Sequence, residues 1–264
     1  TGGPFKDWVE FLRAAAGKLG KTTSARRDVL SLVEQRDFLL AAELLKRKLR
    51  ERWAELLKEE FQRVAAVSKL HAAIVSLDPR IVVTTNFDKL LESAWQSDSA
   101  GRGVRVIAKL DNASFGLFRD DNPYLIKLHG TIDSPSDVIF DKTSYRARAF
   151  DDYYYPSMLR TLLLTHTLVF IGFSMADPAV VSLVEECASR FSGARPHYIL
   201  TAERRCKELM DMSRELRNLY VLSYSDGNSH AELALLIEDL ASRAKARRRE
   251  LAASSVGTSP LHWT

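Results

Sequence analysis

The first 77 residues carry a helical pattern of apolar positions. Large apolar side chains recur every three or four residues, as expected for helices that each bury one face. The clearest run comprises Trp53, Leu57, Phe61, Val64, Val67, Leu70 and Ile74. We therefore expect residues 1–77 to form a segment of two to four helices.

The pattern changes after Asp78 and Pro79, where short β-branched runs begin to alternate with helical stretches. The expected strands are 81–84, 104–107, 124–128, 167–171, 198–200 and 219–222. The expected helices are 88–95, 153–164, 179–190, 202–216 and 231–248. Such alternation is typical of a mostly parallel sheet with helices on both faces. We predict a doubly wound, Rossmann-like α/β core over residues 78–250 and a loose tail over 251–264.

In open parallel sheets, ligands bind outside the carboxyl ends of the strands. Asn86 comes two residues after the first expected strand, and His129 comes directly after the third. Of the six histidines in the sequence, His129 is the one at the carboxyl end of a strand. Gly130 follows it and would let a ligand approach the backbone closely. Asn86 and His129 are therefore the first candidates for chemistry.

Ordinary structural roles are open for the same residues. Asn and Asp often cap helices, and a helix is expected to begin near Asp88, so either Asn86 or Asp88 taken alone fits a cap. A lone histidine is also more often a structural residue than a catalyst. An amide, a carboxylate and an imidazole that converge on one sheet edge are harder to explain by caps.

Composition excludes several classes of protein. The 264 residues are 46% hydrophobic and 27% charged, which is typical of a globular chain and excludes a disordered or collagen-like one. The two cysteines, Cys187 and Cys206, form no C-x-x-C pair, which argues against a zinc ribbon and indicates a reducing cytoplasm. No apolar run approaches the ~20 residues that cross a bilayer, so we expect no membrane segment.

The charge balance is weakly basic, with 38 Lys and Arg against 34 Asp and Glu, a net charge of +4. Much of the excess lies at the end of the last expected helix, at Arg243, Lys245, Arg247, Arg248 and Arg249. A solvated helix end is one interpretation, because cations suit the C-terminal end of a helix dipole. Nucleic-acid binding is the other, and we disfavour it because no aromatic residues interleave with these charges.

Three motifs, each placed after an expected strand, resemble those of the sirtuin family, in particular the sirtuin-like NAD hydrolases of bacterial antiphage defence. They are TTNFD at 84–88, LHG at 128–130 and IGFSMADP at 171–178. Two intervening segments, FDKTSY at 140–145 and YYPSMLRTLL at 154–163, resemble the same branch. The resemblance extends over roughly residues 78–226.

The resemblance implies a role for each matching residue. Asn86 would help to place the attacking water and steady the ribosyl cation, and His129 would be the general base. Asp88 would contact the nicotinamide carboxamide. Four further residues would belong to the NAD site: Thr85, Gly172, Phe173 and Ser174. Of these, Gly172 and Ser174 would pack against the ribose and phosphates.

The activity implied is hydrolysis of NAD to nicotinamide and ADP-ribose, with NAD as the substrate and no metal. An NAD or ADP-ribose sensor without turnover is one alternative. A protein deacylase is another, which we disfavour because the four-cysteine zinc module of sirtuin deacylases cannot be built from two cysteines. The resemblance also implies an off state, kept by self-assembly or by a regulatory partner protein.

One part of the family pattern is not found. Sirtuins open with a strand and a G-A-G-x-S loop whose backbone amides hold the pyrophosphate, and this sequence begins with Thr1-Gly2-Gly3. We expect the natural protein to begin a few tens of residues earlier, with that strand. The helical segment 1–77 would then be the lid or small domain over the NAD site, or else a helical layer without ligand contact.

Overall fold

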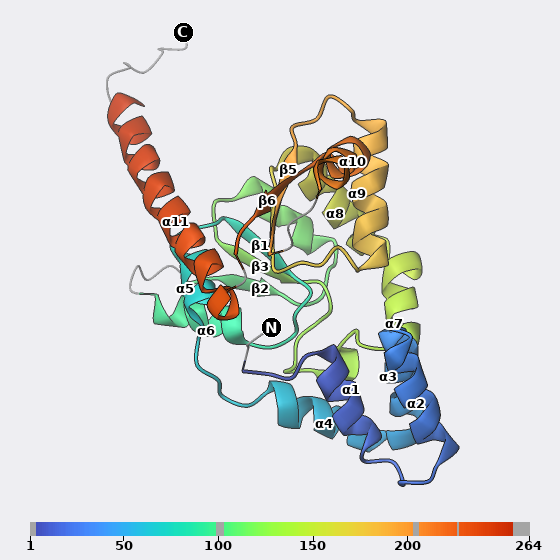
Figure 1. The fold of residues 1–264 in the computed structure, drawn as a ribbon. Helices are drawn as coiled ribbons and strands as arrows, with labels where there is room; N and C mark the ends of the chain where they lie inside the picture. Colours follow the sequence, from blue (N-terminus) through green and yellow to red (C-terminus); the bar gives the residue numbers. More distant parts are fainter. Residues whose placement is uncertain (1–3, 99–102, 203–205, 226, 256–264) are drawn as a thin grey trace.

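The computed structural model describes residues 4–98, 103–202, 206–225 and 227–255 (Figure 1). A block of four helices comes first, and two parallel sheets with their covering helices follow. The block contains α1 (Trp8–Ala16), α2 (Ser24–Glu34), α3 (Phe38–Leu49) and α4 (Glu51–Phe61). Side-chain oxygens of Asp7, Thr23 and Asp37 cap α1, α2 and α3. Polar caps of this kind fix where each helix begins.

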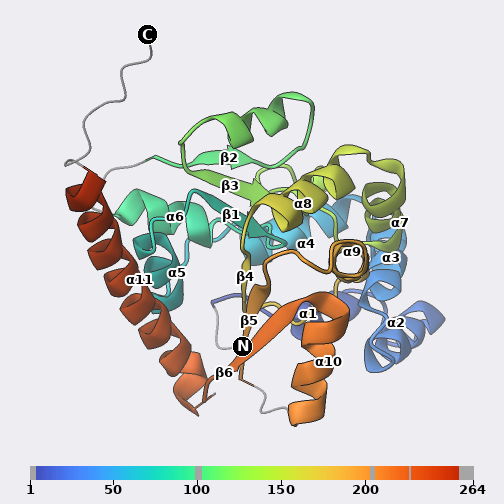
Figure 2. The same cartoon turned by 90° about the horizontal axis from the view of Figure 1, so that it is seen from above.

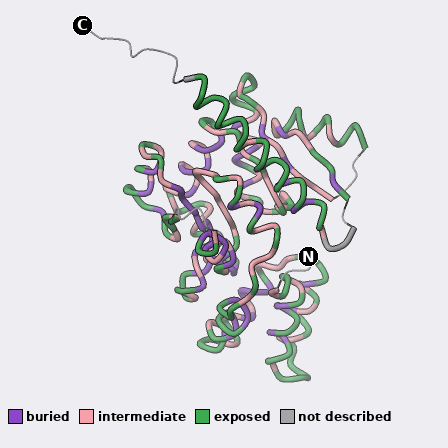
Figure 3. Tube along the Cα trace, turned by 90° about the vertical axis from the view of Figure 1, so that its left-hand side faces the viewer, coloured by how far each residue is buried: buried purple, intermediate pink, exposed green. Residues whose placement is uncertain are grey.

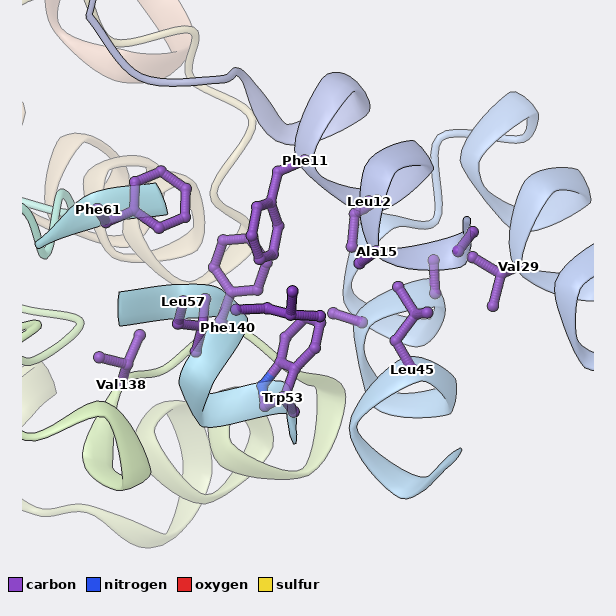
Figure 4. Packing of buried hydrophobic residues seen from close by; sticks show 14 of the residues in the cluster. Phe11, Leu12, Ala15, Val29, Leu45, Trp53, Leu57, Phe61, Val138 and Phe140 are labelled. Atoms are coloured by element: carbon purple, nitrogen blue, oxygen red, sulfur yellow. The ribbon is translucent and has the colours of Figure 1, made fainter. Parts of the chain in front are cut away.

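The helical block is joined to the rest of the chain through an aromatic core. Phe140, which follows the first sheet in the sequence, lies among aromatic side chains from α1 and α4 (Figure 4). Its ring stacks on Trp8 with centroids 4.0 Å apart and meets the edge of Phe11 at 5.5 Å. The block therefore packs directly against the loops that leave the first sheet.

The first sheet contains β1 (Ile81–Thr84), β2 (Arg105–Ile107) and β3 (Tyr124–Lys127), all parallel, in the order β1-β3-β2. The second contains β4 (Val169–Ile171), β5 (His197–Thr201) and β6 (Leu219–Ser223), also parallel, in the order β4-β5-β6. All six strands lie where the sequence predicts strands. Side chains of β1 and β4 meet in one apolar cluster, which joins the two sheets.

Helices cover both faces of the first sheet, and the strand residues alternate between them. Leu125 packs with α5 (Lys69–Ser76) and α6 (Leu90–Ser97), whereas Ile126 packs with α8 (Tyr154–Thr165). In the second sheet, α9 (Pro178–Arg190) and α10 (Lys207–Arg217) lie on one side, and α11 (Gly227–Ser255) lies on the other (Figure 2). The predicted doubly wound α/β fold is confirmed.

Short helical segments connect β2, β3 and α8. They are η1 (Ala113–Arg119), η2 (Pro135–Asp137), α7 (Lys142–Arg146) and η3 (Ala147–Asp151). The division of the chain at residue 77 stays a prediction. Within the expected helical segment, α5 packs against α11 and α6 rather than against α1–α4.

The last helix extends further than predicted, because α11 continues to Ser255 and so enters the segment expected to be a loose tail. Leu251, Ala252 and Ala253 are good helix formers and explain the extension. Residues 256–264 lie outside the described part. Exposed residues run along much of α11 (Figure 3), and none of the helices described is long and apolar enough to cross a membrane.

Basic residues at the end of α11 pair with nearby acceptors. Arg243 contacts Asp239 at 2.7 Å, and Arg247 contacts Glu250 at 3.0 Å. Arg248 donates to the backbone carbonyl of Leu77 at 3.0 Å. These contacts agree with the interpretation of this cluster as a helix end.

Candidate functional site

Asn86 and His129 lie at the same edge of the first sheet. Thr84 and Lys127 are register partners across β1 and β3, and each candidate comes two residues after its own member of this pair. The pairing continues beyond the strands, because the Leu128 amide donates to the Thr84 carbonyl at 2.9 Å. Asn86 is exposed, whereas His129 is only 8% exposed. The two candidates thus leave neighbouring parallel strands at their carboxyl ends.

The turn after His129 is held by backbone hydrogen bonds on both sides. The Ile139 amide donates to the His129 carbonyl at 3.0 Å, and the Ile132 amide donates to the Phe87 carbonyl at 2.8 Å. Gly130 has φ +81°, a left-handed conformation that favours glycine. His129 is therefore presented by a turn that is hydrogen-bonded to its surroundings.

Of the two possible helix caps, the structure supports one. The Leu90 amide donates to Asp88 Oδ1 at 2.9 Å, so Asp88, one residue before the N-cap position, accepts from the first residue of α6. Asn86 lies three residues before Lys89, the N-cap position of α6, and does not have that role. Its backbone amide donates to Thr84 Oγ1 at 3.0 Å. The contact of Asp88 with nicotinamide stays a prediction, and so does the place of the neighbouring Thr85 in the NAD site.

The segment after β4 carries the remaining candidates. Gly172 has φ +62° and is exposed, as is Ser174. Phe173 packs against Phe170 with ring centroids 5.8 Å apart, so its side chain contributes to the core as well as to this edge. The roles of these three residues toward NAD stay predictions. The same segment ends at Asp177, which caps α9.

Asp177, which follows β4 of the second sheet, contacts His129, which follows β3 of the first sheet. Its Oδ2 lies 3.3 Å from His129 Nε2, although the two strands that carry these segments belong to different sheets. The ring N–H does not point at the carboxylate well enough for a hydrogen bond, so the contact is one of charge. It becomes strongest when the imidazole is protonated.

The other carboxylate oxygen of Asp177 accepts three hydrogen bonds. The Tyr145 hydroxyl donates at 2.5 Å, and the amides of Ala179 and Val180 donate at 3.1 and 3.2 Å. Burial by itself raises the pKa of the Asp177 carboxyl, but its close contact with His129 and the hydrogen bond from Tyr145 outweigh burial and hold the pKa below its usual value. Asp177 is therefore ionised at neutral pH.

Sequence reasoning assigned no role to Asp177 or Tyr145. Both lie inside segments that carried the family resemblance, IGFSMADP at 171–178 and FDKTSY at 140–145. The signal that could have found them is the position of Asp177 just past a strand end, directly before a proline that starts a helix. Their contact with His129 was not visible, because three segments distant in sequence meet there.

A surface pocket lies beside this edge, with Lys89, which follows Asp88, and Thr131, two residues after His129, in its wall. The pocket, of about 370 Å³ between α6 and β2, is also lined by Trp95, Val106 and Asp133, and none of the candidates named above lines it. Within the residues described, no group of three or more His, Cys, Asp or Glu side chains could hold a metal ion.

Comparisons with known proteins identify the core region. The sequence model of the SIR2-like domain matches residues 80–225, more than half of the 264 residues and the whole of both sheets. The NAD(+) hydrolase ThsA of Bacillus cereus (strain MSX-D12) is 26% identical over 208 residues, which cover 78% of this chain and 42% of that protein.

Two further relatives give a similar result. The NAD(+) hydrolase ThsA of Enterococcus faecium is 25% identical over 207 residues, covering 74% of this chain and 40% of the relative. Defense-associated sirtuin 2 of Bacillus subtilis is 29% identical over 129 residues, covering 46% of this chain and 12% of the relative. The chain spans less than half the length of each of these relatives.

Proposed function

The chain belongs to the SIR2-like family, as its strand-end motifs predicted, and we propose that it hydrolyses NAD to nicotinamide and ADP-ribose. The observation that carries this proposal is the register of Asn86 and His129 at one sheet edge, with an ionised Asp177 beside the imidazole. The names of the relatives, NAD(+) hydrolase and defense-associated sirtuin, support both the reaction and a role in antiphage defence.

The chemistry suits the side chains present. Breaking the bond between nicotinamide and the ribose leaves an electron-poor carbon, and nicotinamide departs as a neutral molecule. Water then forms the new C–O bond, and its proton passes to His129. A neutral imidazole is a suitable base for this step. The exposed amide of Asn86 is the group that orients the water.

We also propose that one more strand completes the sheet between β1 and β4. In the described residues, each of these strands is paired on one side only. The apolar side chains of Val82, Val83 and Ile171 in these two strands are only half-buried. Amide hydrogen exchange in the natural full-length protein tests this: rapid exchange at the free edges of β1 and β4 would contradict it.

The off state, a self-assembled form or a partner protein, and a cytoplasmic location remain proposals of the same kind. Cys187 and Cys206 are both free thiols, which agrees with a reducing compartment. Native mass spectrometry of the natural protein tests the assembly, because a single monomeric species with full activity contradicts an off state kept by association.

The reaction is tested by nicotinamide release from NAD with the natural full-length protein and its Asn86→Ala and His129→Ala variants. Loss of a general base predicts a fall of ~10²–10⁴-fold for His129→Ala. Asn112→Ala and His166→Ala are matched controls. Asn112 is exposed next to η1, and His166 lies at the amino end of β4, so neither is at the site edge.

The outcomes separate the three candidate activities. Equal amounts of nicotinamide and ADP-ribose, lost in both site variants and kept in both controls, support the hydrolase. NAD binding without any release of nicotinamide would identify the sensor. Release that depends on an acetylated peptide would identify the deacylase.

A further inference from the structure

Three elements meet at the side chain of Asp177. His129 follows β3, Tyr145 belongs to α7, and Asp177 itself precedes α9. The side chains of His129 and Asp177 are only 10% and 9% exposed. The Tyr145 ring meets the edge of the His129 ring with centroids 6.2 Å apart. These groups form a buried cluster around the Asp177 carboxylate.

We propose that Asp177 is the positioning residue of His129: it keeps the proton of the neutral ring on Nε2, directs Nδ1 toward the reacting water, and stabilises the imidazolium that forms. This inference rests on the proposed function. An ionised carboxylate has no hydrogen of its own, so its negative charge favours a ring nitrogen 3.3 Å away that carries its hydrogen over one that presents a lone pair. The other ring nitrogen then holds the lone pair that takes the proton from water.

The two oxygens of Asp177 have separate tasks. Oδ1 is occupied by the Tyr145 hydroxyl and by the amides at the start of α9. Tyr145 is itself fixed, because the Ala179 amide donates to its hydroxyl oxygen at 2.8 Å. This leaves Oδ2 for His129 and holds it in place. A carboxylate that served only to cap the helix would need no such fixed second oxygen.

Charge is the property through which Asp177 acts. An opposite charge within ~4–6 Å typically changes a pKa by ~1–3 units when little water screens it. Two more ionisable hydroxyls face the carboxylate, Tyr145 from α7 and Tyr155 from α8, and burial raises the pKa of both, so they stay neutral at physiological pH. Arg148 of η3 acts on Tyr155. Of the described groups facing His129 here, Asp177 supplies the negative charge.

The test is the substitution Asp177→Asn in the natural full-length protein, followed by NMR titration of the His129 ring. Asparagine keeps an oxygen that can cap α9 and accept from Tyr145, but it removes the charge. We expect the pKa of His129 to fall by about one unit or more. The acid limb of kcat/KM for NAD should move to lower pH by the same amount. At the plateau, kcat should fall on the order of 10²-fold with KM nearly unchanged.

Asp37→Asn is the matched control, because Asp37 caps α3 through the Leu40 amide as Asp177 caps α9, and it does not belong to the cluster around the Asp177 carboxylate. It should leave both the titration and the pH profile where they are. An unchanged pKa of His129 in Asp177→Asn overturns the inference, whatever the activity. A lowered pKa in a protein that hydrolyses no NAD overturns the proposed function and leaves the pairing intact.

A second measurement needs no variant and covers the case in which Asp177→Asn does not fold. Nitrogen chemical shifts of the neutral His129 ring in the unmodified protein identify which nitrogen carries the proton. We expect protonated Nε2 and bare Nδ1. The opposite tautomer overturns the inference.

Discussion

A Cβ atom at Gly130 would lie 3.0 Å from the backbone carbonyl oxygen of Asp137. The turn that presents His129 thus depends on close contact between two backbone segments as well as on the left-handed conformation of Gly130. We expect Gly130→Ala to destabilise the fold by about 2–3 kcal/mol, since both the conformation and the clash oppose it. Urea unfolding at pH 7.5 measures the loss.

Gly172→Ala is the matched variant for that prediction. Gly172 also has a positive φ, +62°, but a Cβ there would meet no described atom within 4 Å. The backbone conformation alone should cost about 1–2 kcal/mol. Equal losses for the two glycines would show that the approach to Asp137 does not matter.

A buried ion pair lies at the end of β3, two residues before His129. The ammonium group of Lys127 is fully buried, contacts Glu92 Oε1 at 2.6 Å and also donates to the Asp88 carbonyl. Lys127→Met leaves the Glu92 charge uncompensated and should destabilise the protein by about 3–5 kcal/mol. The double variant with Glu92→Leu should recover most of this loss, because both charges are then gone. A double variant as unstable as Lys127→Met would contradict this account.

Stability should fall on mild acidification, in part because of His197. This residue is buried, and its Nδ1 accepts from the Leu168 amide at 3.2 Å, which requires a bare nitrogen. Burial holds the pKa of His197 below its usual value, so the unfolded chain binds the proton more readily than the folded one. This stabilisation is fully present at pH values above ~6.5, which is the pKa of a histidine in the unfolded chain. It is lost as the pH falls from there through the lower pKa that His197 has in the folded protein.

Urea midpoints at pH 7.5 and 5.0 measure this effect, and His197→Asn is the informative variant. The asparagine oxygen can accept from Leu168 but does not titrate in this range. The acid-induced loss of stability should be smaller in the variant than in the unmodified protein. If the unmodified protein and the variant lose the same stability between these pH values, the loss belongs to other groups. His71 and His166 are such groups, because burial lowers their pKa as well.

Strands and the site edge could be predicted because their signals are local. The residues of β1 and β3 are mostly Ile, Val, Leu and Tyr, which favour strands, and polar residues end each run. The alternation of strands with helices then specifies a parallel sheet, and a parallel sheet puts Asn86 and His129 at one edge. Each step uses neighbours in the sequence or a general rule of topology.

The parts that escaped prediction depend on contacts between distant segments. Asp177 comes 48 positions after His129 in the sequence. The periodicity of apolar residues does not predict that the loop after β4 contacts the end of β3. The partner of α5 escaped for a similar reason. Periodicity shows that a helix has an apolar face, but it does not say whether α4 or α11 covers it.

Phe140 links the helical block to the cluster around His129, and its removal should affect both. Its ring lies within 6.5 Å of the rings of Trp8, Phe11, Trp53, Phe61 and Phe87. Phe140→Ala should destabilise the protein by about 3–5 kcal/mol through the lost contacts and the cavity that remains. Phe140→Leu keeps most of the volume and should lose clearly less.

The effect of Phe140→Ala should also reach the site, because the next residue is tied to both regions. Asp141 caps α7, which carries Tyr145, and its Oδ2 accepts from Lys46 of α3 at 2.7 Å. Displacing this segment would move the hydroxyl that fixes Asp177 and so the position of His129. At a urea concentration where the variant is still folded, we expect nicotinamide release to fall while NAD binding persists. Full activity in a folded but destabilised Phe140→Ala protein would mean that the helical block serves stability alone.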